Sequence, residues 1–168
     1  LALVLIKVTA IRKSYPQARW FSRIIQICII ALAFVIQVSL TRFTMKTAIV
    51  IMTDPKAGSD EATSRVLNAL GYADEAKRAG DELAIVFAGT GTRWPGELSK
   101  LSHPANERYN RLRENILGAS RGCAVRNGAV EGLQAAGVPL LTDNALPGTP
   151  GVASIRRFYA EGWNVSIF

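Results

Sequence analysis

The fold class is decided by residues 48–87, which read AIVIMTDPKAGSDEATSRVLNALGYADEAKRAGDELAIVF. Two short apolar runs, Ala48 to Met52 and Leu83 to Phe87, predict buried strands. Between them, the sequence predicts a helix that begins after Ser59 and ends at Gly80. Apolar side chains recur along this helix every three or four residues, at Ala62, Val66, Ala69, Leu70, Ala73 and Ala76. Such spacing gives the helix one face that can pack on a sheet, so this stretch predicts a strand–helix–strand unit.

The remaining sequence continues the alternation of strands and helices. Further strands are expected at 118–123 (a strand or a turn), 138–141 and 164–168, and further helices at 104–117, 125–136 and through 155–159. This order predicts an α/β domain with a mostly parallel five-stranded sheet and helices on both faces. Ligands and reactive groups of such folds collect outside the carboxyl ends of the strands. In this chain those ends fall at 53–59, 88–94, 122–127 and 141–150.

Charge is distributed unevenly along the 168 residues, whose net charge is +7. Six of the 20 basic residues and none of the 13 acidic ones lie in residues 1–44, so residues 45–168 carry 14 basic against 13 acidic side chains. A nearly neutral body without clustered bases does not predict binding to nucleic acid. With two cysteines in different surroundings and one histidine, the chain also predicts neither a disulfide framework nor a zinc site.

Residues 1–44 form a basic and apolar leader that is separate from the domain expected at residues 45–168. Its apolar run, Ile24 to Leu40, has 17 uncharged residues, which is the lower limit for a membrane span. Three interpretations stay open: upstream translation before a first residue at Met45, a membrane anchor at residues 24–40, or a cleaved signal. We accordingly expect a cytoplasmic protein, or one that is anchored to a membrane through residues 24–40.

Cys123 is the residue with the most reactive chemistry at these strand ends. A thiolate is a useful nucleophile, and it is favoured near helix N-termini and cationic side chains. Cys123 stands just before the start of a predicted helix, with Arg121 and Arg126 close in sequence, while Gly122 leaves room for a partner's thiol or backbone and Asn127 lies at the same strand end. The alternative is that Cys123 is a small buried hydrophobic residue.

Other strand ends carry weaker candidates. Asp54 is predicted either to bind a metal or substrate amine or to cap its own loop. The stretch Gly89 to Thr92, which includes Thr90, is predicted to be a phosphate cradle or, more simply, a turn that lines a pocket. His103 is either a general base or a solvated loop residue.

Five segments resemble the DsrE-like family. They are GASRGCA at 118–124, GAVEG at 128–132, AGVPLL at 136–141, DNALPG at 143–148 and the opening strand KTAIV at 46–50. The resemblance covers most of residues 45–168. It implies a flavodoxin-like three-layer α/β fold and assembly into trimers or hexamers. We expect exposed Trp94, Tyr109 or Trp163 to gain burial in such an assembly.

The same resemblance implies a function. In active members of the family, a cysteine at the position of Cys123 carries sulfur as a persulfide. The chain is therefore expected to be a sulfur carrier or sulfurtransferase that takes sulfur from a donor protein and passes it to an acceptor, without a cofactor or metal. Arg121, Gly122, Arg126 and Asn127, with Asp54, Thr90 and Asn144, are expected to tune the cysteine or line its pocket. The alternative is a non-catalytic assembly or small-ligand-binding protein with the same fold.

Overall fold

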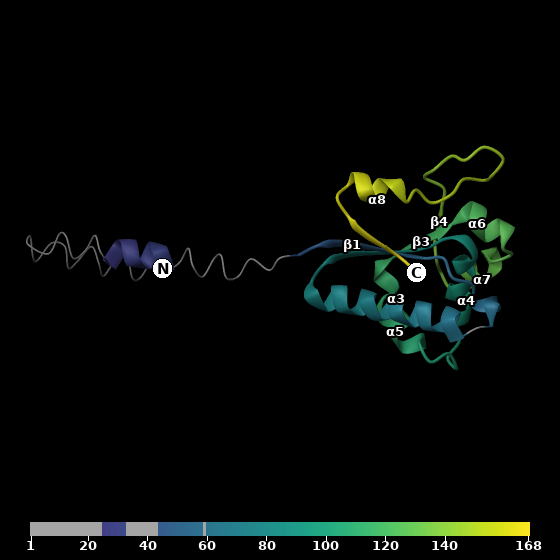
Figure 1. Cartoon of the computed structure of the whole chain (residues 1–168), viewed down its shortest axis with the longest axis horizontal. Coiled ribbons are helices and arrows are strands. Elements are labelled where there is room, and N and C mark those ends of the chain that lie inside the picture. Colours follow the sequence, from purple (N-terminus) through teal and green to yellow (C-terminus); the bar gives the residue numbers. More distant parts are fainter. Residues whose placement is uncertain (1–24, 33–43, 59) are drawn as a thin grey trace, which may run out of the picture. The chain divides into compact units, whose positions relative to one another are not determined.

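The computed structural model describes residues 25–32, 44–58 and 60–168. The chain divides into two compact units, Leu1–Phe43 and Thr44–Phe168. In the first unit, residues 25–32 are helical and exposed (Figure 1), whereas the rest of the apolar run, residues 24 and 33–40, lies outside the described residues. Within the described ranges, no helix combines the length and the apolar character that a membrane span requires.

The strand–helix–strand unit forms as the sequence predicts. It consists of β1 (Lys46–Ile51), α3 (Asp60–Ala79) and β2 (Glu82–Phe87). The six expected apolar positions of α3 are its buried residues, so the predicted helix face is confirmed. Gly80 follows the helix with a φ of +87°, a left-handed conformation that glycine adopts without strain. Ser59, after which this helix was expected to begin, lies outside the described residues.

The sheet is completed by β3 (Ile116–Ser120), β4 (Leu140–Leu141) and β5 (Asn164–Ile167). Its order is β4-β3-β2-β1-β5, and every neighbouring pair is parallel. The predicted three-layer α/β fold with a parallel five-stranded sheet is confirmed. Four strands follow one another across the sheet, whereas the flavodoxin order is 2-1-3-4-5. β5 then returns to the far side of β1, so the direction of the chain reverses between β1 and β5.

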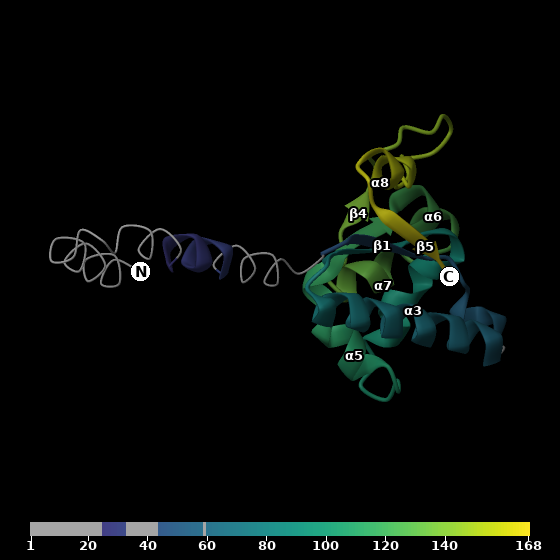
Figure 2. The same cartoon turned by 60° about the vertical axis from the view of Figure 1, so that its left-hand side comes forward.

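Helices cover both faces of the sheet, as Figures 1 and 2 show. On one face, the larger core cluster takes buried side chains from α3, α4 (Trp94–Leu98), α5 (Asn106–Arg111), α6 (Arg121–Arg126) and α7 (Val130–Ala135). On the other face, α8 (Arg156–Ala160) places Phe158 against the small side chains of Ala48 and Ala84. The main core therefore lies on the α3 side of the sheet.

The helix expected at 104–117 is wrong in its second half. The structure has α5, then the 3-10 helix η4 (Arg113–Asn115), and then β3 from Ile116. Pairing of β3 with β2 overrides the polar helical pattern there, because Ile116 lies beside Ile85 and joins the main core. The register shifts after this pair, so Leu117 is an extra residue in β3, as in a β-bulge.

The segment around Cys123 also differs from the prediction. β3 ends at Ser120, and the helix α6 (Arg121–Arg126) starts at the next residue, where a strand was expected to continue to 123. The helix expected at 125–136 is two helices, α6 and α7, because Gly128 between them has a φ of +61°. The expected strand 138–141 is shortened to β4.

Candidate functional site

Cys123 lies in the first turn of α6, directly after the carboxyl end of β3. It is partly exposed, as a free thiol. The prediction that it stands before the helix is corrected to a place inside it, because β3 ends three residues earlier. Arg121 and Arg126, from the same helix, are exposed and have no ion pair within the described part of the chain. The carboxyl edge of the sheet therefore carries a thiol flanked in sequence by two solvated cations.

Arg93 fixes the position of this helix. It is the last residue of the 3-10 helix η3 (Gly89–Arg93), which follows β2. Its Nε donates a hydrogen bond to the carbonyl oxygen of Asn127 over 3.0 Å, and its Nη1 lies 2.6 Å from Oδ2 of Asp54. The guanidinium thus joins the loop after β1 to the end of α6. Sequence reasoning missed Arg93, because only the fold brings residues 54, 93 and 127 together.

The Asn127 side chain adds a second tie. Its Nδ2 donates to the carbonyl oxygens of Gly89, at 2.9 Å, and of Cys123, at 2.8 Å. With Arg93, this amide connects α6 to the ends of both β1 and β2. Two predicted site residues, Asp54 and Asn127, are thereby brought into one polar network. A side chain on α6 is held more firmly by this network than a side chain on a free loop would be.

The electrostatics of the network favour an ionised Asp54. Burial alone would raise the pKa of this carboxyl group, but hydrogen bonds from the Lys56 amide and from Arg93, and the positive charges of both residues, outweigh it. The pKa of Asp54 therefore lies below its ordinary value. Asp54 also accepts from the Lys56 amide as the cap of the 3-10 helix η2 (Pro55–Ala57). These contacts agree with the loop-capping interpretation of Asp54.

Gly122 serves close packing within the chain. Its amide donates to the carbonyl oxygen of Gly151 over 2.7 Å. A Cβ on Gly122 would lie 2.9 Å from Cγ1 of Val152 and 3.0 Å from the Gly151 oxygen. The predicted opening for a partner's backbone is therefore occupied by the chain's own segment 142–155. Asn144 belongs to that segment, where it exchanges two backbone hydrogen bonds of 2.9 Å with Val152.

The stretch Gly89 to Thr92 forms most of η3 and packs on the end of β1. The Thr90 hydroxyl donates to the carbonyl oxygen of Met52 over 3.0 Å. A Cβ on Gly91 would collide with the backbone carbonyl of Ile51, so only glycine fits there. These contacts join the ends of the two central strands, and they match the turn interpretation better than the phosphate cradle.

His103 lines a pocket of about 330 Å³ beside this network. The other residues that line it are Pro55, Lys56, Thr63, Arg93, Trp94 and Glu97. The imidazole is partly buried rather than fully solvated, with its ring edge-on to Trp94 at a centroid distance of 6.2 Å. Its Nδ1 accepts the Ala105 amide hydrogen over 3.1 Å, and burial lowers its pKa.

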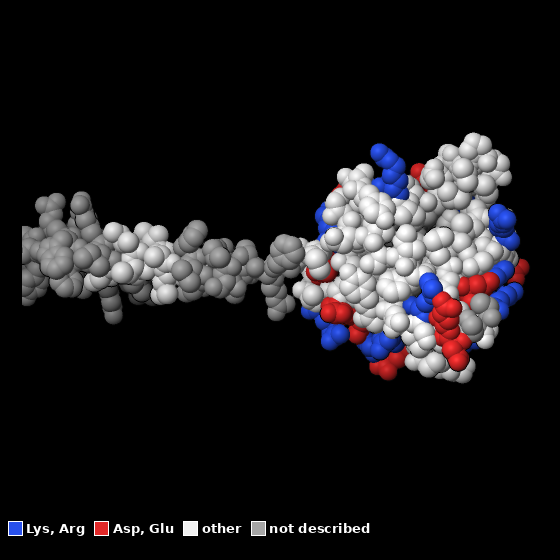
Figure 3. Space-filling view, viewed as in Figure 1, with Lys and Arg blue, Asp and Glu red and all other residues white. Residues whose placement is uncertain are grey.

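The charged surface has no dominant sign on the face drawn in Figure 3, where Lys and Arg side chains intermingle with Asp and Glu. Residues that could together hold a metal ion are not grouped anywhere in the described ranges.

Comparisons with known proteins return no match: no family model, no curated protein and no solved structure is similar to this chain.

Proposed function

We propose that the protein is a sulfur carrier of the DsrE-like kind, which holds persulfide sulfur on Cys123. The observation that carries the proposal is the placement of Cys123, a partly exposed thiol on a helix that two side chains tie to the centre of the sheet. A carrier needs access for two partners in turn and a fixed nucleophile for both. The partial exposure of Cys123 and the hydrogen bonds that hold α6 support both requirements.

The proposed transfer is a pair of thiol exchanges. The Cys123 thiolate attacks the outer sulfur of a donor persulfide, so that a new S–S bond forms on Sγ while the donor's S–S bond breaks and its thiolate leaves. An acceptor thiolate then attacks the outer sulfur, and Cys123 leaves as a thiolate. Each step exchanges one S–S bond for another, so no external oxidant or reductant is required. Arg121 and Arg126 are the cationic side chains of the same helix, and cations near a thiol generally favour such exchanges.

Self-association and a reducing, cytoplasmic location are part of the same proposal. Trp94 and Tyr109, expected to be exposed, are buried in the main core, and Trp163 is partly buried. The aromatic argument for an oligomer is therefore wrong, because these rings already pack within one chain. β5 is an edge strand of the sheet, and its outer edge has no strand partner among the described residues. A second copy would cover this edge strand, and light scattering of the full chain tests that arrangement.

Sulfur loading is tested on the full chain by intact mass after incubation with a small persulfide such as cysteine persulfide. The chain has two cysteines, so Cys28→Ser isolates Cys123 and Cys123→Ser isolates Cys28. We expect the Cys28→Ser protein to gain one sulfur atom about tenfold faster than the Cys123→Ser protein, because Cys123 lies on a helix that the hydrogen bonds of Arg93 and Asn127 hold in place. The added sulfur should then leave to an acceptor thiol.

Arg126→Ala sharpens the test. Removing this charge should slow loading without abolishing it, since the arginine takes no part in bond making. Arg78→Ala is the matched control. Arg78 is an exposed arginine in the last turn of α3, so this substitution should leave sulfur loading unchanged. Equal loading at both cysteines would reject the carrier proposal and favour the non-catalytic alternative.

A further inference from the structure

A second pocket lies at the point where the chain direction reverses in the sheet. β1 leads to β2 on one side, whereas β5 arrives on the other side from β4. In open parallel sheets, the crevice outside the carboxyl ends of two such strands is the usual place for a ligand, because the connections leave it uncovered. Here the crevice is between the end of β1, at Met52 and Thr53, and the end of β5, at Ile167 and Phe168.

The pocket has a volume of about 410 Å³, within the range of small-molecule sites. One wall is apolar, formed by Met52, Ile167 and Phe168. Met52 and Ile167 are 44% and 56% exposed, so this wall presents apolar surface to solvent. The opposite wall comes from the first turns of α3 and carries Glu61 and Arg65. The pocket thus combines an apolar wall with a charged one.

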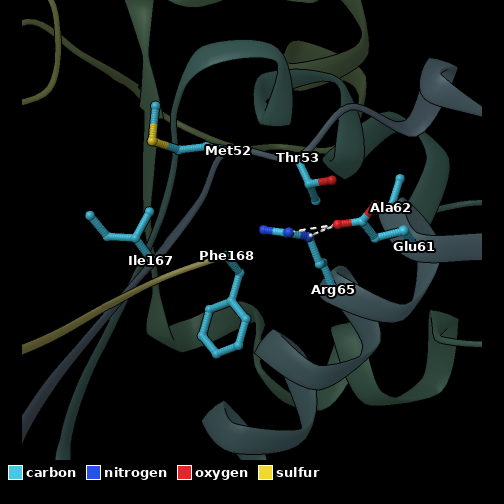
Figure 4. A pocket seen from close by; sticks show the side chains of 7 residues that line it. All are labelled: Met52, Thr53, Glu61, Ala62, Arg65, Ile167 and Phe168. Atoms are coloured by element: carbon cyan, nitrogen blue, oxygen red, sulfur yellow. Dashed lines mark hydrogen bonds and ion pairs between the residues drawn. The ribbon is translucent and has the colours of Figure 1, made fainter. Parts of the chain in front are cut away.

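Arg65 supplies the recognition group of the charged wall. Its Nε and Nη2 both donate to Oε1 of Glu61, at 3.0 and 2.6 Å. Figure 4 shows the guanidinium between Thr53 and Phe168, with another nitrogen turned away from Glu61 toward the Ile167 side. The outer edge of a guanidinium can bind a carboxylate through two hydrogen bonds. In the described part of the chain, the Thr53 hydroxyl has no hydrogen-bond partner, so it can donate to the same group.

We propose that this pocket binds a small monocarboxylic acid with an apolar body. Arg65 and Thr53 would hold the carboxylate, while Met52, Ile167 and Phe168 would cover the aliphatic or aromatic part. Glu61 favours a singly charged ligand, because its own negative charge opposes a dianion such as a phosphate monoester. The ligand therefore needs both a carboxylate and an apolar body, because either feature alone would contact only one wall of the pocket.

This site is separate from Cys123. β5 and β3 stand on opposite sides of the β1–β2 pair, so the pocket between the ends of β1 and β5 lies two to three strand spacings from β3, roughly 10–14 Å. The binding proposal consequently does not depend on sulfur transfer. Failure of either test leaves the other intact.

Benzoate is the probe, titrated into the full chain by calorimetry, with benzamide and acetate as comparators. Benzamide keeps the ring without the charge, and acetate keeps the charge without the ring. We expect benzoate to bind at least about tenfold more tightly than either comparator. The same titration is repeated on Arg65→Gln, which should weaken benzoate binding about tenfold or more.

Arg78→Gln is the matched control. Like Arg65, Arg78 pairs with a carboxylate four residues earlier on α3, but it lies at the far end of the helix. Each substitution removes one exposed ion pair, which contributes little to stability, so both variants should fold. Benzoate affinity should stay unchanged in Arg78→Gln. The proposal is overturned if benzoate binds no better than benzamide, or if Arg65→Gln binds benzoate as tightly as Arg78→Gln.

Discussion

The two faces of the sheet are covered very unequally. Among the described residues, the cluster on the α3 face has 21 buried members, whereas the cluster on the α8 face has four. The α3 face uses large side chains such as Ile85 and Phe87, and five helices, α3 to α7, contribute to it. The α8 face is built from Ala48, Ala84 and Val86, and a single five-residue helix covers it through Phe158.

We infer from this difference that the α3 face sets the global stability of the domain, whereas the α8 face is where the domain opens locally. Burial of apolar area is the main source of folding free energy, so the α3 face holds the domain together. The α8 face needs small side chains because its cover, α8 with the segment 142–155, is thin. The same segment reaches α6, where the Gly151 carbonyl accepts the Gly122 amide. The weakly held cover is therefore in contact with the helix of Cys123, and it is where local opening should concentrate.

The largest effect is expected on the α3 face. Phe87→Ala removes a fully buried ring from the end of β2, and the helices around it cannot collapse into the space. We expect a loss of about 3–5 kcal/mol in the free energy of unfolding, measured by urea denaturation. A loss below about 1 kcal/mol would contradict the assignment of global stability to this face.

Phe158→Ala removes the same atoms from the α8 face. Partly buried neighbours such as Ile155 and Trp163 can move into the space, so the global loss should be smaller, about 2 kcal/mol. Hydrogen exchange should become faster in α8 and β5 while α3 stays protected. Equal exchange throughout the domain would show that the two faces unfold as one unit.

The two faces also differ in how well the sequence predicts their helices and strands. The buried stripe of α3 is readable because a helix of 20 residues repeats its pattern many times. β4 has only two residues and α8 only five, so neither carries enough repeats to define its limits. The α5–β3 boundary was mispredicted because contact with β2, not local preference, makes Ile116 a strand residue.

The candidate site shows the same limit. The place of Cys123 near the carboxyl end of a strand could be predicted from the order of elements, whereas the end of β3 at Ser120 could not. Arg93 could not, since its partners Asp54 and Asn127 lie 39 and 34 residues away. The sequence also could not predict that segment 142–155 fills the space beside Gly122. Contacts of this kind depend on the three-dimensional position of loops, and loop sequences carry no periodic pattern.

Arg93→Lys tests whether the hydrogen-bond network at the carboxyl edge of the sheet holds α6 in place. Lysine keeps a positive charge near Asp54, but it cannot reproduce the Nε bond to Asn127 in the same geometry. We expect a loss of about 1–2 kcal/mol in unfolding free energy and faster hydrogen exchange in α6. Arg78→Lys, on the exposed side of α3, is the control and should change neither measurement.

The smallest effect concerns pH and His103 on the α3 face. Its pKa in the folded state is lowered from 6.5, mainly by burial, with Glu97 opposing and Lys100 adding to the shift. The unfolded chain therefore binds the proton more readily. Stability should be constant above this ordinary value and should fall as pH drops from it toward the folded pKa.

Denaturation midpoints measured between about pH 8 and 5 should reveal this step, and His103→Gln should remove it. The chain has a single histidine, so no other imidazole contributes. Because His103 packs against Trp94 of the main core, hydrogen exchange should change in α4 and α5 and not in α8. An identical pH step in the His103→Gln protein would assign the titration to another group.

The pairing of β1 with β5 has a consequence for how the chain is made. Thr47 and Asn164 are partners in register, yet they are far apart in sequence. During synthesis, β1 to β4 can assemble in the order in which they emerge, since each pairs with its predecessor. One edge of β1 stays unpaired until residues 164–167 leave the ribosome. The crevice bounded by Ile167 and Phe168 therefore forms after β1 to β4 have assembled, when β5 docks beside β1.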